Sequence, residues 1–501
     1  MERRLGALLL ADPAWPGSGS LELHDRRLFL GLPVHQVHCE NWRTCLYRSG
    51  GEVNRPTGED HVHQTRYGQR GDQGNGGITS QYLYCMVPAV QVLPSQDSGW
   101  LARLFPSPMR HPDIVRQGWI RGLPLHNFLV ILYHLARIPL PLCAVLVALL
   151  VGPSVLTFHQ PKAAGALLAG FAVFDVALLA LLPVLGVSFG WIQPPWLLFS
   201  AGRSGAAALV GSLVPAAVEL PALAGVQLAL TCLVLYGSLV EPFWVEQTRL
   251  PLHVRGFHGP PLRLLLLTDL HVERLTRREH RVLDTIRRER PDLILIGGDL
   301  LNLSYVGEPR AIEEVRRFLG GLAAPLGVYL VRGTVDVDPP HVVARVLDGL
   351  DQIRLLDGER IRVGNPSPQL EIVGLPADGD LEAIRARLRR LVEAAPRDLP
   401  LICLHHTPDL LQEAAQLGLE LYLAGHTHGG QICLPLVGPL ATASRFGRRY
   451  VRGTHRLSRT QGYVSRGLGL EGLGAPRIRF LARPELVWIS LESGEKDRET
   501  G

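Results

Sequence analysis

Cysteine is scarce in this sequence, and its spacing indicates none of the architectures that depend on it. The chain has 501 residues and seven cysteines, which are scattered along its length at Cys39, Cys45, Cys85, Cys143, Cys232, Cys403 and Cys433. No two of them form a Cys-x-x-Cys pair, so the pattern indicates neither a disulfide framework nor a structural zinc site. Stability must come from apolar cores, which a chain of this length can build in two or three domains.

Clustered positive charge is also missing. Lys and Arg total 51 against 46 Asp and Glu, for a formal net charge of +5, and arginine far outnumbers lysine. The basic residues are spread along the chain, without a basic patch interleaved with aromatic side chains. Such a patch is the usual signature of nucleic-acid binding, so we expect no nucleic-acid partner.

The N-terminal quarter lacks the apolar periodicity of a packed domain. Gly, Ser, Gln, His and Arg dominate residues 48–77, a composition that does not bury a core. At the start of the chain, a short apolar run over residues 5–11 ends at Asp12, so a clean signal peptide is not indicated. We expect residues 1–115 to be poorly structured, and we assign them no function.

A long apolar block follows. Between residues 138 and 240 the charged side chains are Lys162, Asp175, Arg203 and Glu219. About 20 apolar residues cross a bilayer, and the block divides into spans at 138–158, 163–185 and 221–240, with a less certain fourth at 193–218. These segments are apolar all round, whereas a soluble helix would carry a polar stripe. We therefore predict a transmembrane helical segment over residues 125–242, with three or four spans and a multi-pass membrane location.

Two questions about this block stay open. Asp175 lies inside a span without an obvious basic partner, so it is either a functional carboxylate or one that is buried against a neighbouring helix. Before the first span, Arg110, Arg116, Arg121 and Arg137 favour a cytoplasmic N-terminal side. Four spans would return the C-terminal domain to the cytoplasm and three would leave it outside, so the side of that domain is unknown.

Residues 262–492 read as an α/β domain, and residues 493–501 form a charged tail. Strand-like apolar runs alternate with charged helical segments. Five of these runs, at residues 264–267, 293–296, 328–331, 401–404 and 421–424, are followed directly by Asp, His or Gly-rich segments. Ligands of open α/β sheets bind beyond the carboxyl ends of the strands, so residues that are far apart in sequence can meet there.

The last of these runs leads into the most informative stretch, Gly-His-Thr-His-Gly-Gly at residues 425–430. A loop bounded by glycines can turn His426 and His428 toward one point, although they lie only two residues apart. Neutral imidazole is the commonest ligand for first-row metals. The alternative is that both histidines cap the strand and serve packing alone.

The strand ends carry motifs that together resemble those of the calcineurin-like metallophosphoesterases. The motifs are Asp269-Leu-His271, Gly-Asp299, Gly333-x-x-Asp336, His406-Thr-Pro and Gly-His426-Thr-His428. Residues 424–431, followed by residues 464–469 and 484–486, resemble a bacterial phosphodiesterase subgroup whose membrane-tethered members include the transmembrane proteins with a metallophosphoesterase domain. The resemblance covers roughly the last 240 residues. It implies a four-layer αββα sandwich, here preceded by the transmembrane segment.

The resemblance also implies a site for two divalent metal ions. The matching ligands are Asp269, His271 and His428 for one ion, His406 and His426 for the other, Asp299 as a bridge between both, and Thr334 at the place of a further ligand. Carboxylates with imidazoles suit Mn²⁺ best and also allow Fe or Zn. In the family, a hydroxide held between the ions attacks the phosphorus in line, and no protein nucleophile is needed.

One motif departs from the family pattern. Gly333, Thr334, Val335 and Asp336 stand where Gly-Asn-His-Asp is expected. Threonine is a poorer ligand than asparagine, and valine cannot transfer the proton that the histidine would, a loss of about 10²–10⁴-fold in rate. Three interpretations remain. The protein is active only on an activated ester, another group such as His405 replaces the missing histidine, or the domain binds metal without catalysis. With Asp299, we take Asp336 and His405 as catalytic candidates, the alternative for His405 being a supporting or packing role.

The function that these features favour is a membrane-anchored, metal-dependent phosphoester hydrolase, acting as a phosphodiesterase or pyrophosphatase. A site held near a bilayer makes membrane lipid a partner, and some relatives imply a lipid-linked substrate such as a diacylated UDP-glucosamine. The alternative is a degenerate metallophosphoesterase that serves as a membrane-associated metal-binding or regulatory module. A transporter-like role for the apolar block, with Asp175 in the pathway, is the weakest hypothesis.

Overall fold

The computed structural model describes residues 19–21, 34–41, 44–49, 124–365, 369–377, 380–394 and 398–494. The chain divides into two compact units, residues 1–98 and 99–501. In the first, β1 (Gly19–Leu21), β2 (Val34–Asn41) and β3 (Thr44–Ser49) form an antiparallel sheet in the order β1-β2-β3. The remainder of the N-terminal region that we expected to be poorly structured lies outside the described residues.

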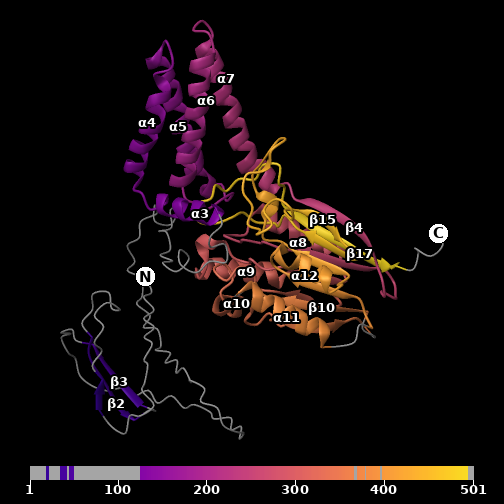
Figure 1. Cartoon of the computed structure of the whole chain (residues 1–501). Helices are drawn as coiled ribbons and strands as arrows, with labels where there is room; N and C mark the ends of the chain where they lie inside the picture. Colours follow the sequence, from indigo (N-terminus) through magenta and orange to yellow (C-terminus); the bar gives the residue numbers. More distant parts are fainter. Residues whose placement is uncertain are drawn as a thin grey trace, which may run out of the picture. The chain divides into compact units, whose positions relative to one another are not determined.

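The second unit begins with a helical bundle (Figure 1). Its helices are α3 (Pro124–Leu135), α4 (Leu140–Val155), α5 (Pro161–Val184), α6 (Gln193–Leu213) and α7 (Glu219–Leu235). The last helix continues through a π-helical turn, η1 (Tyr236–Val240), into a 3-10 turn, η2 (Glu241–Phe243). Each of the four expected spans therefore falls on a helix.

The helices differ in whether they are long and apolar enough to cross a membrane. By length and composition, α5 and the continuous helix Glu219–Phe243 qualify among the described residues. The helix that covers the expected span at 138–158 is shorter than that span. It is α4, which begins after Pro139 and has only 16 residues, fewer than the roughly 20 that a bilayer requires. The helix over the uncertain fourth span, α6, contains the charged Arg203.

Asp175 has a basic partner that the sequence reading missed. Arg203 Nε and Nη2 donate to the two carboxylate oxygens of Asp175, both at 2.7 Å, and both side chains are buried. The remaining guanidinium donors reach the Gln227 carbonyl oxygen and Thr231 Oγ1 on α7, each at 3.0 Å. Arg203 therefore does not simply interrupt a span, because it joins three helices through Asp175, Gln227 and Thr231.

Two six-stranded sheets form the C-terminal domain. The first has the order β4-β17-β5-β6-β7-β8, with β4 (Glu246–Val254), β17 (Glu485–Ser493), β5 (Leu262–Leu267), β6 (Leu293–Ile296), β7 (Val328–Leu330) and β8 (Ile353–Leu355). The second has the order β15-β16-β12-β11-β10-β9, with β15 (Gly453–Leu457), β16 (Thr460–Val464), β12 (Leu421–Ala424), β11 (Leu401–His405), β10 (Leu370–Leu375) and β9 (Glu359–Val363). In each sheet the central strands run parallel, from β5 to β8 and from β10 to β12 with β16.

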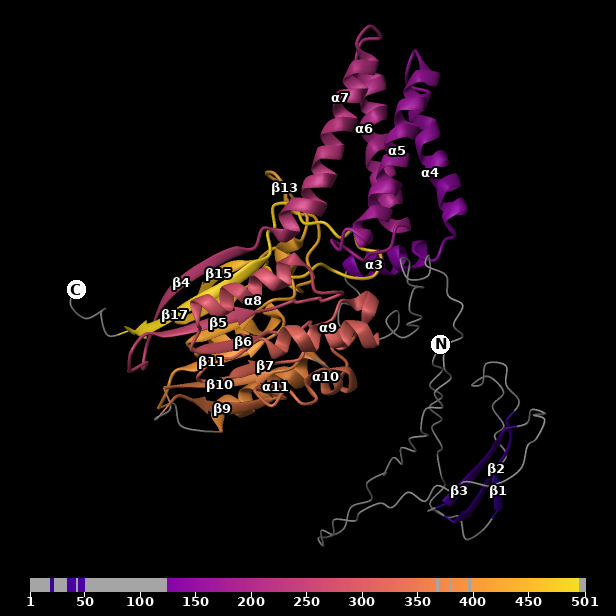
Figure 2. The ribbon, with the colours of Figure 1, turned by 180° about the vertical axis from the view of Figure 1, so that it is seen from behind.

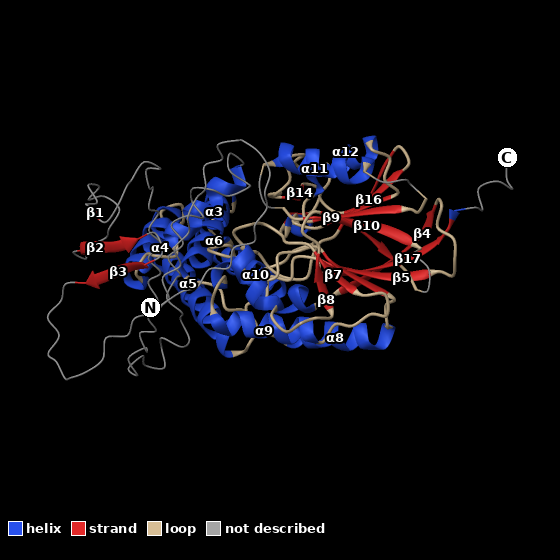
Figure 3. Cartoon of the chain, turned by 90° about the horizontal axis from the view of Figure 1, so that it is seen from below, coloured by secondary structure: helices blue, strands red, loops and turns tan. Residues whose placement is uncertain are grey.

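Alternation of apolar side chains along the strands builds the layers. On β5, Leu264 and Leu266 pack between the sheets against residues such as Ile402 and Leu423, while Leu265 faces the opposite core. That outer core is covered by α8 (Arg277–Glu289), α9 (Pro309–Gly320) and α10 (Pro340–Leu347). The second sheet is covered by α11 (Leu381–Glu393) and α12 (Leu411–Gln416), and Figure 3 shows both helical layers. The predicted αββα sandwich is confirmed.

Candidate metal centre

The predicted strand ends meet at one edge of the sandwich. Asp269, Asp299 and Thr334 follow the parallel neighbours β5, β6 and β7 in the first sheet. His406 and His426 follow β11 and β12, which are parallel neighbours in the second sheet. Because the two sheets pack face to face, these carboxyl ends bring side chains from five segments of the chain close together.

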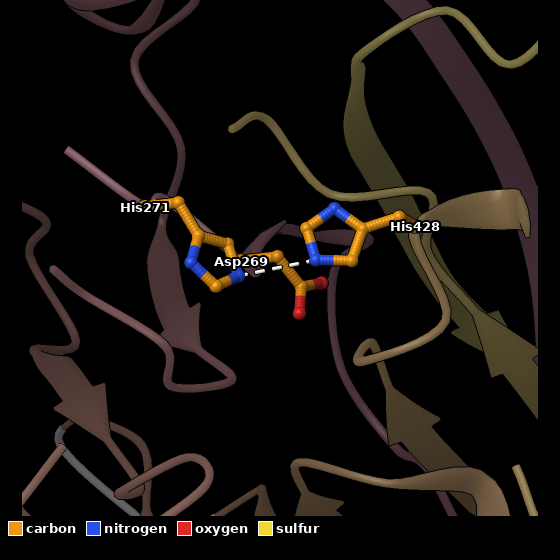
Figure 4. A group of neighbouring side chains, drawn as sticks. All are labelled: Asp269, His271 and His428. Atoms are coloured by element: carbon orange, nitrogen blue, oxygen red, sulfur yellow. Dashed lines mark hydrogen bonds between the residues drawn. The ribbon is translucent and has the colours of Figure 1, made fainter. Parts of the chain in front are cut away.

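One half of the cluster consists of Asp269, His271 and His428, whose donor atoms lie within 4.8 Å of one another. His428 lies in the short turn η5 (His428–Gly430). Its Nε2 lies 3.1 Å from His271 Nε2, and the Asp269 carboxylate lies beside both rings (Figure 4). All three side chains are buried.

The other half consists of Asp299, His406 and His426, again within 4.8 Å. His406 Nε2 lies 3.0 Å from His426 Nδ1. The opposite ring nitrogen of His406 lies 2.7 Å from the Gly297 carbonyl oxygen, which fixes the orientation of the ring. The sandwich thus gathers two buried sets, each with one carboxylate and two imidazoles.

Asp299 joins the two halves. Its Oδ2 lies 3.4 Å from His271 Nε2 and 3.2 Å from His406 Nε2. Its other oxygen accepts the backbone N–H of Thr334 at 2.7 Å. A single carboxylate oxygen therefore faces imidazoles of both sets, as a ligand shared between two cations would.

The backbone is strained at most of these residues. Five of the six have φ in the left-handed region: Asp269 (50°), His271 (39°), Asp299 (55°), His426 (71°) and His428 (51°). Such conformations cost about 1–3 kcal/mol each, and they persist where the surrounding structure imposes them. The close approach of the strand ends contributes to these constraints on the backbone. A Cβ on Gly333 would lie 2.1 Å from Asp299 Oδ1.

The cluster suits divalent cations. Asp269 Oδ2 is buried without a hydrogen-bond partner among the described residues. Burying a carboxylate oxygen in this way is costly unless a cation or a hydrogen-bond donor offsets the lost hydration. The imidazole nitrogens that face one another at 3.0 and 3.1 Å are separated by about the distance between two ligands of one ion with bonds of roughly 2.0–2.1 Å. The donors are carboxylates and imidazoles, which bind Mn²⁺, Fe²⁺ and Zn²⁺.

The electrostatics of the cluster divide its members. Burial raises the pKa of Asp269. Burial opposes the charge of His271 and His406, but the nearby Asp299 carboxylate raises the pKa of both, that of His406 to about 9. Burial opposes the charge of Asp299, but the positive charge of His406 and hydrogen bonds from His271 and His406 hold its pKa well below the usual value. Burial and the neighbouring His406 lower the pKa of His426 to about 3, while burial and His271 lower the pKa of His428 well below its usual value. Neutral imidazole and ionised carboxylate are the forms that coordinate metal.

The altered motif lies directly beside this cluster. Thr334 Oγ1 lies 3.4 Å from His406 Nε2, so its hydroxyl is close to the place of the expected ligand. Thr334, Val335 and Asp336 are all half-buried, and Asp336 is not part of either three-residue set. The carboxylate that supports the cluster is instead Asp338, which accepts the backbone N–H of Asp299 at 2.7 Å and that of Gly333 at 2.9 Å.

His405 is not brought into the cluster. Its Nδ1 lies 3.0 Å from the Leu375 carbonyl oxygen and its Nε2 lies 3.2 Å from Thr407 Oγ1. Burial lowers its pKa to about 4, so the ring is neutral. Because consecutive residues at the end of a strand point to opposite faces, His405 and His406 cannot both face the candidate metal cluster, and the packing alternative describes the position of His405.

Arg479 is a second supporting residue that sequence reasoning missed. Its guanidinium is fully buried and donates to the carbonyl oxygens of Ala482 at 2.7 Å, Gly469 at 2.6 Å and Arg466 at 3.0 Å. Nη2 also lies 3.5 Å from His428 Nδ1. Burial lowers the pKa of Arg479 to about 9. No motif marked this arginine, because its partners are backbone carbonyls.

Comparison with known proteins agrees with this geometry. Residues 262–430 match the family model of the calcineurin-like phosphoesterases. The phosphodiesterase YaeI of Escherichia coli (strain K12) is 31% identical over 265 residues, which cover 51% of this chain and 92% of YaeI. The chain belongs to the calcineurin-like metallophosphoesterase family.

Two further relatives also carry a metallophosphoesterase domain. The metallophosphoesterase YkuE of Bacillus subtilis (strain 168) is 29% identical over 279 residues, covering 52% of this chain and 89% of YkuE. A zebrafish (Danio rerio) transmembrane protein with a metallophosphoesterase domain is 27% identical over 276 residues, covering 52% of this chain and 60% of the zebrafish protein. Proteins of this family are hydrolases that bind divalent metals, and the two three-residue sets are the candidate ligands here.

Proposed function

We propose that this protein is a membrane-anchored, metal-dependent phosphoester hydrolase whose site holds two divalent ions, with Mn²⁺ preferred over Fe or Zn. Asp269, His271 and His428 would hold one ion, His406 and His426 the other, and Asp299 both. The observation that carries the proposal is the position of Asp299 Oδ2, 3.4 Å from His271 and 3.2 Å from His406.

Anchoring in a membrane is supported by the outer surface of the helical bundle. Large apolar side chains face outward on α4, α5, α6 and α7, among them Leu149 (66% exposed), Val173 (64%) and Leu209 (63%). Exposed apolar surface of this extent is unfavourable in water and favourable in lipid. The polar contacts among Asp175, Arg203 and Gln227 are turned to the inside of the bundle, as expected for helices surrounded by lipid.

The chain's own residues position the reacting groups. When bound, two divalent ions lower the pKa of water and neutralise charge on phosphoryl oxygens. The N–H of Thr334 orients Asp299, and Asp338 holds the backbone of Asp299 and Gly333. Arg479 joins the backbone at His428 to the backbone at Gly469. These contacts place the ligand atoms before substrate arrives, so that little reorganisation is needed during the reaction.

Val335 narrows the class of substrate. A valine has no proton to give to a leaving alkoxide, so catalysis requires a leaving group that is stable as an anion. The phosphate released from a pyrophosphate linkage, whose second pKa is about 6, meets that requirement, as does the phenolate of an activated diester. We therefore favour a pyrophosphate or activated phosphodiester, and the membrane anchor favours a lipid-linked one such as a diacylated UDP-glucosamine.

The test uses the full chain in detergent or nanodiscs with bis-p-nitrophenyl phosphate and Mn²⁺. Asp299→Ala is expected to lower turnover by about 10²-fold or more, because the shared ligand is lost, and to lower the bound Mn²⁺ measured by elemental analysis. Asp284→Ala is the matched control, since this aspartate is exposed on α8. Turnover that is unchanged in Asp299→Ala, or independent of metal, contradicts the proposal.

The altered motif also supports a second candidate, a metal-binding regulatory module without catalysis. Here Val335 replaces a proton donor and Thr334 replaces an amide ligand. The same experiment separates the two functions. Stoichiometric metal that depends on Asp299, together with no turnover on activated diesters or pyrophosphates, is the outcome expected of the module.

A further inference from the structure

A hairpin beside the metal centre exposes a concentrated apolar tip. Residues 433–440, which we call the apolar hairpin, comprise β13 (Cys433–Leu434), a turn and β14 (Gly438–Pro439), followed by Leu440. Leu436 is fully exposed, Val437 is 52% exposed and Leu440 is 55% exposed. Apolar side chains gathered on an exposed tip usually mark a contact with a protein or a membrane.

Hydrogen bonds and ring contacts tie this hairpin to the end of the last bundle helix. The Cys433 N–H donates to the Phe480 carbonyl oxygen at 2.8 Å, and the Phe480 ring meets the ring of Tyr236 edge-on with centroids 6.1 Å apart. Two residues later, the Ala482 N–H donates to the Glu241 carboxylate at 2.6 Å. Tyr236 and Glu241 belong to η1 and η2, so the hairpin lies at the C-terminal end of a candidate span (Figure 2).

The segment of sequence that contains the hairpin is strongly basic. Residues 431–460 contain six arginines and neither Asp nor Glu. Arg448 Nη1 donates to the Val437 carbonyl oxygen at 2.8 Å, and Arg448, Arg449 and Arg452 are all exposed. Arginines that flank an exposed apolar segment complement the anionic headgroups of a lipid surface.

Trp244 and Arg483 form an aromatic and basic pair at the C-terminal end of the helix that runs from α7 through η2. Trp244 directly follows η2 and is 53% exposed, with Arg483 Cζ 4.6 Å from its ring centroid. Tryptophan and arginine prefer the interface between lipid and water. The basic segment that follows the hairpin lies beside this pair, since Arg452 Nη1 donates to the carbonyl oxygen of the exposed Leu481 at 2.7 Å, two residues before Arg483.

We propose that the apolar hairpin inserts its tip into the interfacial layer of an anionic phospholipid bilayer, with the flanking arginines on the headgroups. The inference rests on the proposed membrane anchoring. The hairpin would give the protein a second contact with the membrane, besides the helical bundle and next to the candidate metal centre. Because η5 (His428–Gly430) ends three residues before the hairpin, this contact would hold the candidate site close to phosphate groups at the lipid surface.

Photocrosslinking of the full chain in nanodiscs tests this proposal. The photoreactive residue p-benzoylphenylalanine would replace Leu436 in one variant and Val173, on the outer face of α5, in a second. A third variant replaces Glu382 on α11, which Figures 1 and 2 place on the side of the domain away from α4–α7. The discs contain phosphatidylcholine with or without phosphatidylglycerol, and lipid adducts are measured by mass spectrometry. Bound Mn²⁺ is measured in each variant as a check of folding.

The expected result is roughly tenfold more lipid adduct at position 436 than at position 382, and more in discs with phosphatidylglycerol than without. Adduct at position 173 but none above background at position 436 overturns the hairpin contact and leaves the anchoring intact. Adduct at neither position overturns the anchoring itself. Crosslinks from position 436 to a second copy of the chain, in place of lipid, overturn the assignment of lipid as the occupant.

Discussion

The carboxylate of Asp338 accepts the backbone N–H of Asp299 at 2.7 Å, across 39 residues of sequence. It also accepts the N–H groups of Leu300 and Gly333, each at 2.9 Å. One side chain thereby holds the ends of β6 and β7 together. Because Asp299 has a left-handed φ of 55°, its position depends on such external contacts, and Asp338 positions a residue of the candidate metal centre.

Replacing Asp338 with Asn is therefore expected to weaken metal binding by about 10–100-fold, the usual effect of losing a partner that orients a ligand. The amide would present one acceptor and an NH₂ group to several N–H donors, which costs about 1–3 kcal/mol in the free energy of unfolding. Titration calorimetry with Mn²⁺ and chemical denaturation measure the two effects. Asp284→Asn serves as the exposed control, and equal Mn²⁺ affinity in both variants would show that Asp338 does not position the site.

Removal of metal is expected to destabilise the C-terminal domain. At metal concentrations about 1,000 times the dissociation constant, binding adds roughly 4 kcal/mol, which corresponds to a fall in melting temperature of about 8–16 °C on chelation for a domain of this size. Differential scanning calorimetry with and without EDTA gives the shift. Asp299→Ala, which lacks the shared ligand, should show a much smaller shift, and an equal one in both proteins would refute metal binding at this cluster.

Restoring a proton donor at Val335 is expected to widen the range of substrates. With Val335→His, hydrolysis of diesters with poor leaving groups should rise by about 10²-fold or more, because a general acid typically contributes this much. Hydrolysis of p-nitrophenyl esters, whose leaving group needs no proton, should change little. Val335→Phe adds similar bulk without a proton, so equal rates for the His and Phe variants would argue against this account of the motif.

The buried pair of Asp175 and Arg203 yields a prediction about the bundle. Arg203→Met leaves a buried carboxylate without its partner, so we expect a loss of about 3–5 kcal/mol in unfolding free energy. The double variant Asp175→Leu with Arg203→Met removes both charges and should recover most of that loss. Unfolding in mixed micelles, followed by circular dichroism, measures each variant. Strictly additive effects of the two substitutions would mean that the pair is not coupled.

Most of the fold and the candidate ligand cluster could be predicted because their signals are local. Apolar runs of four residues predicted β5, β6, β11 and β12, and the Asp and His residues within a few positions after them form the candidate metal centre. The length of α4 was overestimated because apolar composition continues past Val155, where the helix ends. His405 could not be distinguished from His406 by composition, since only the face of the strand separates them.

The sequence by itself determined which side chains could bind metal, where strands end and which helices are apolar, because each of these follows from residues close together in the chain. Tertiary structure alone decided that Asp338 supports Asp299, that Arg479 holds the loops around His428, and that Arg203 neutralises Asp175. These partners are separated by 28 to 51 residues. Their pairing depends on how strands and helices pack, and no spacing rule along the chain encodes it.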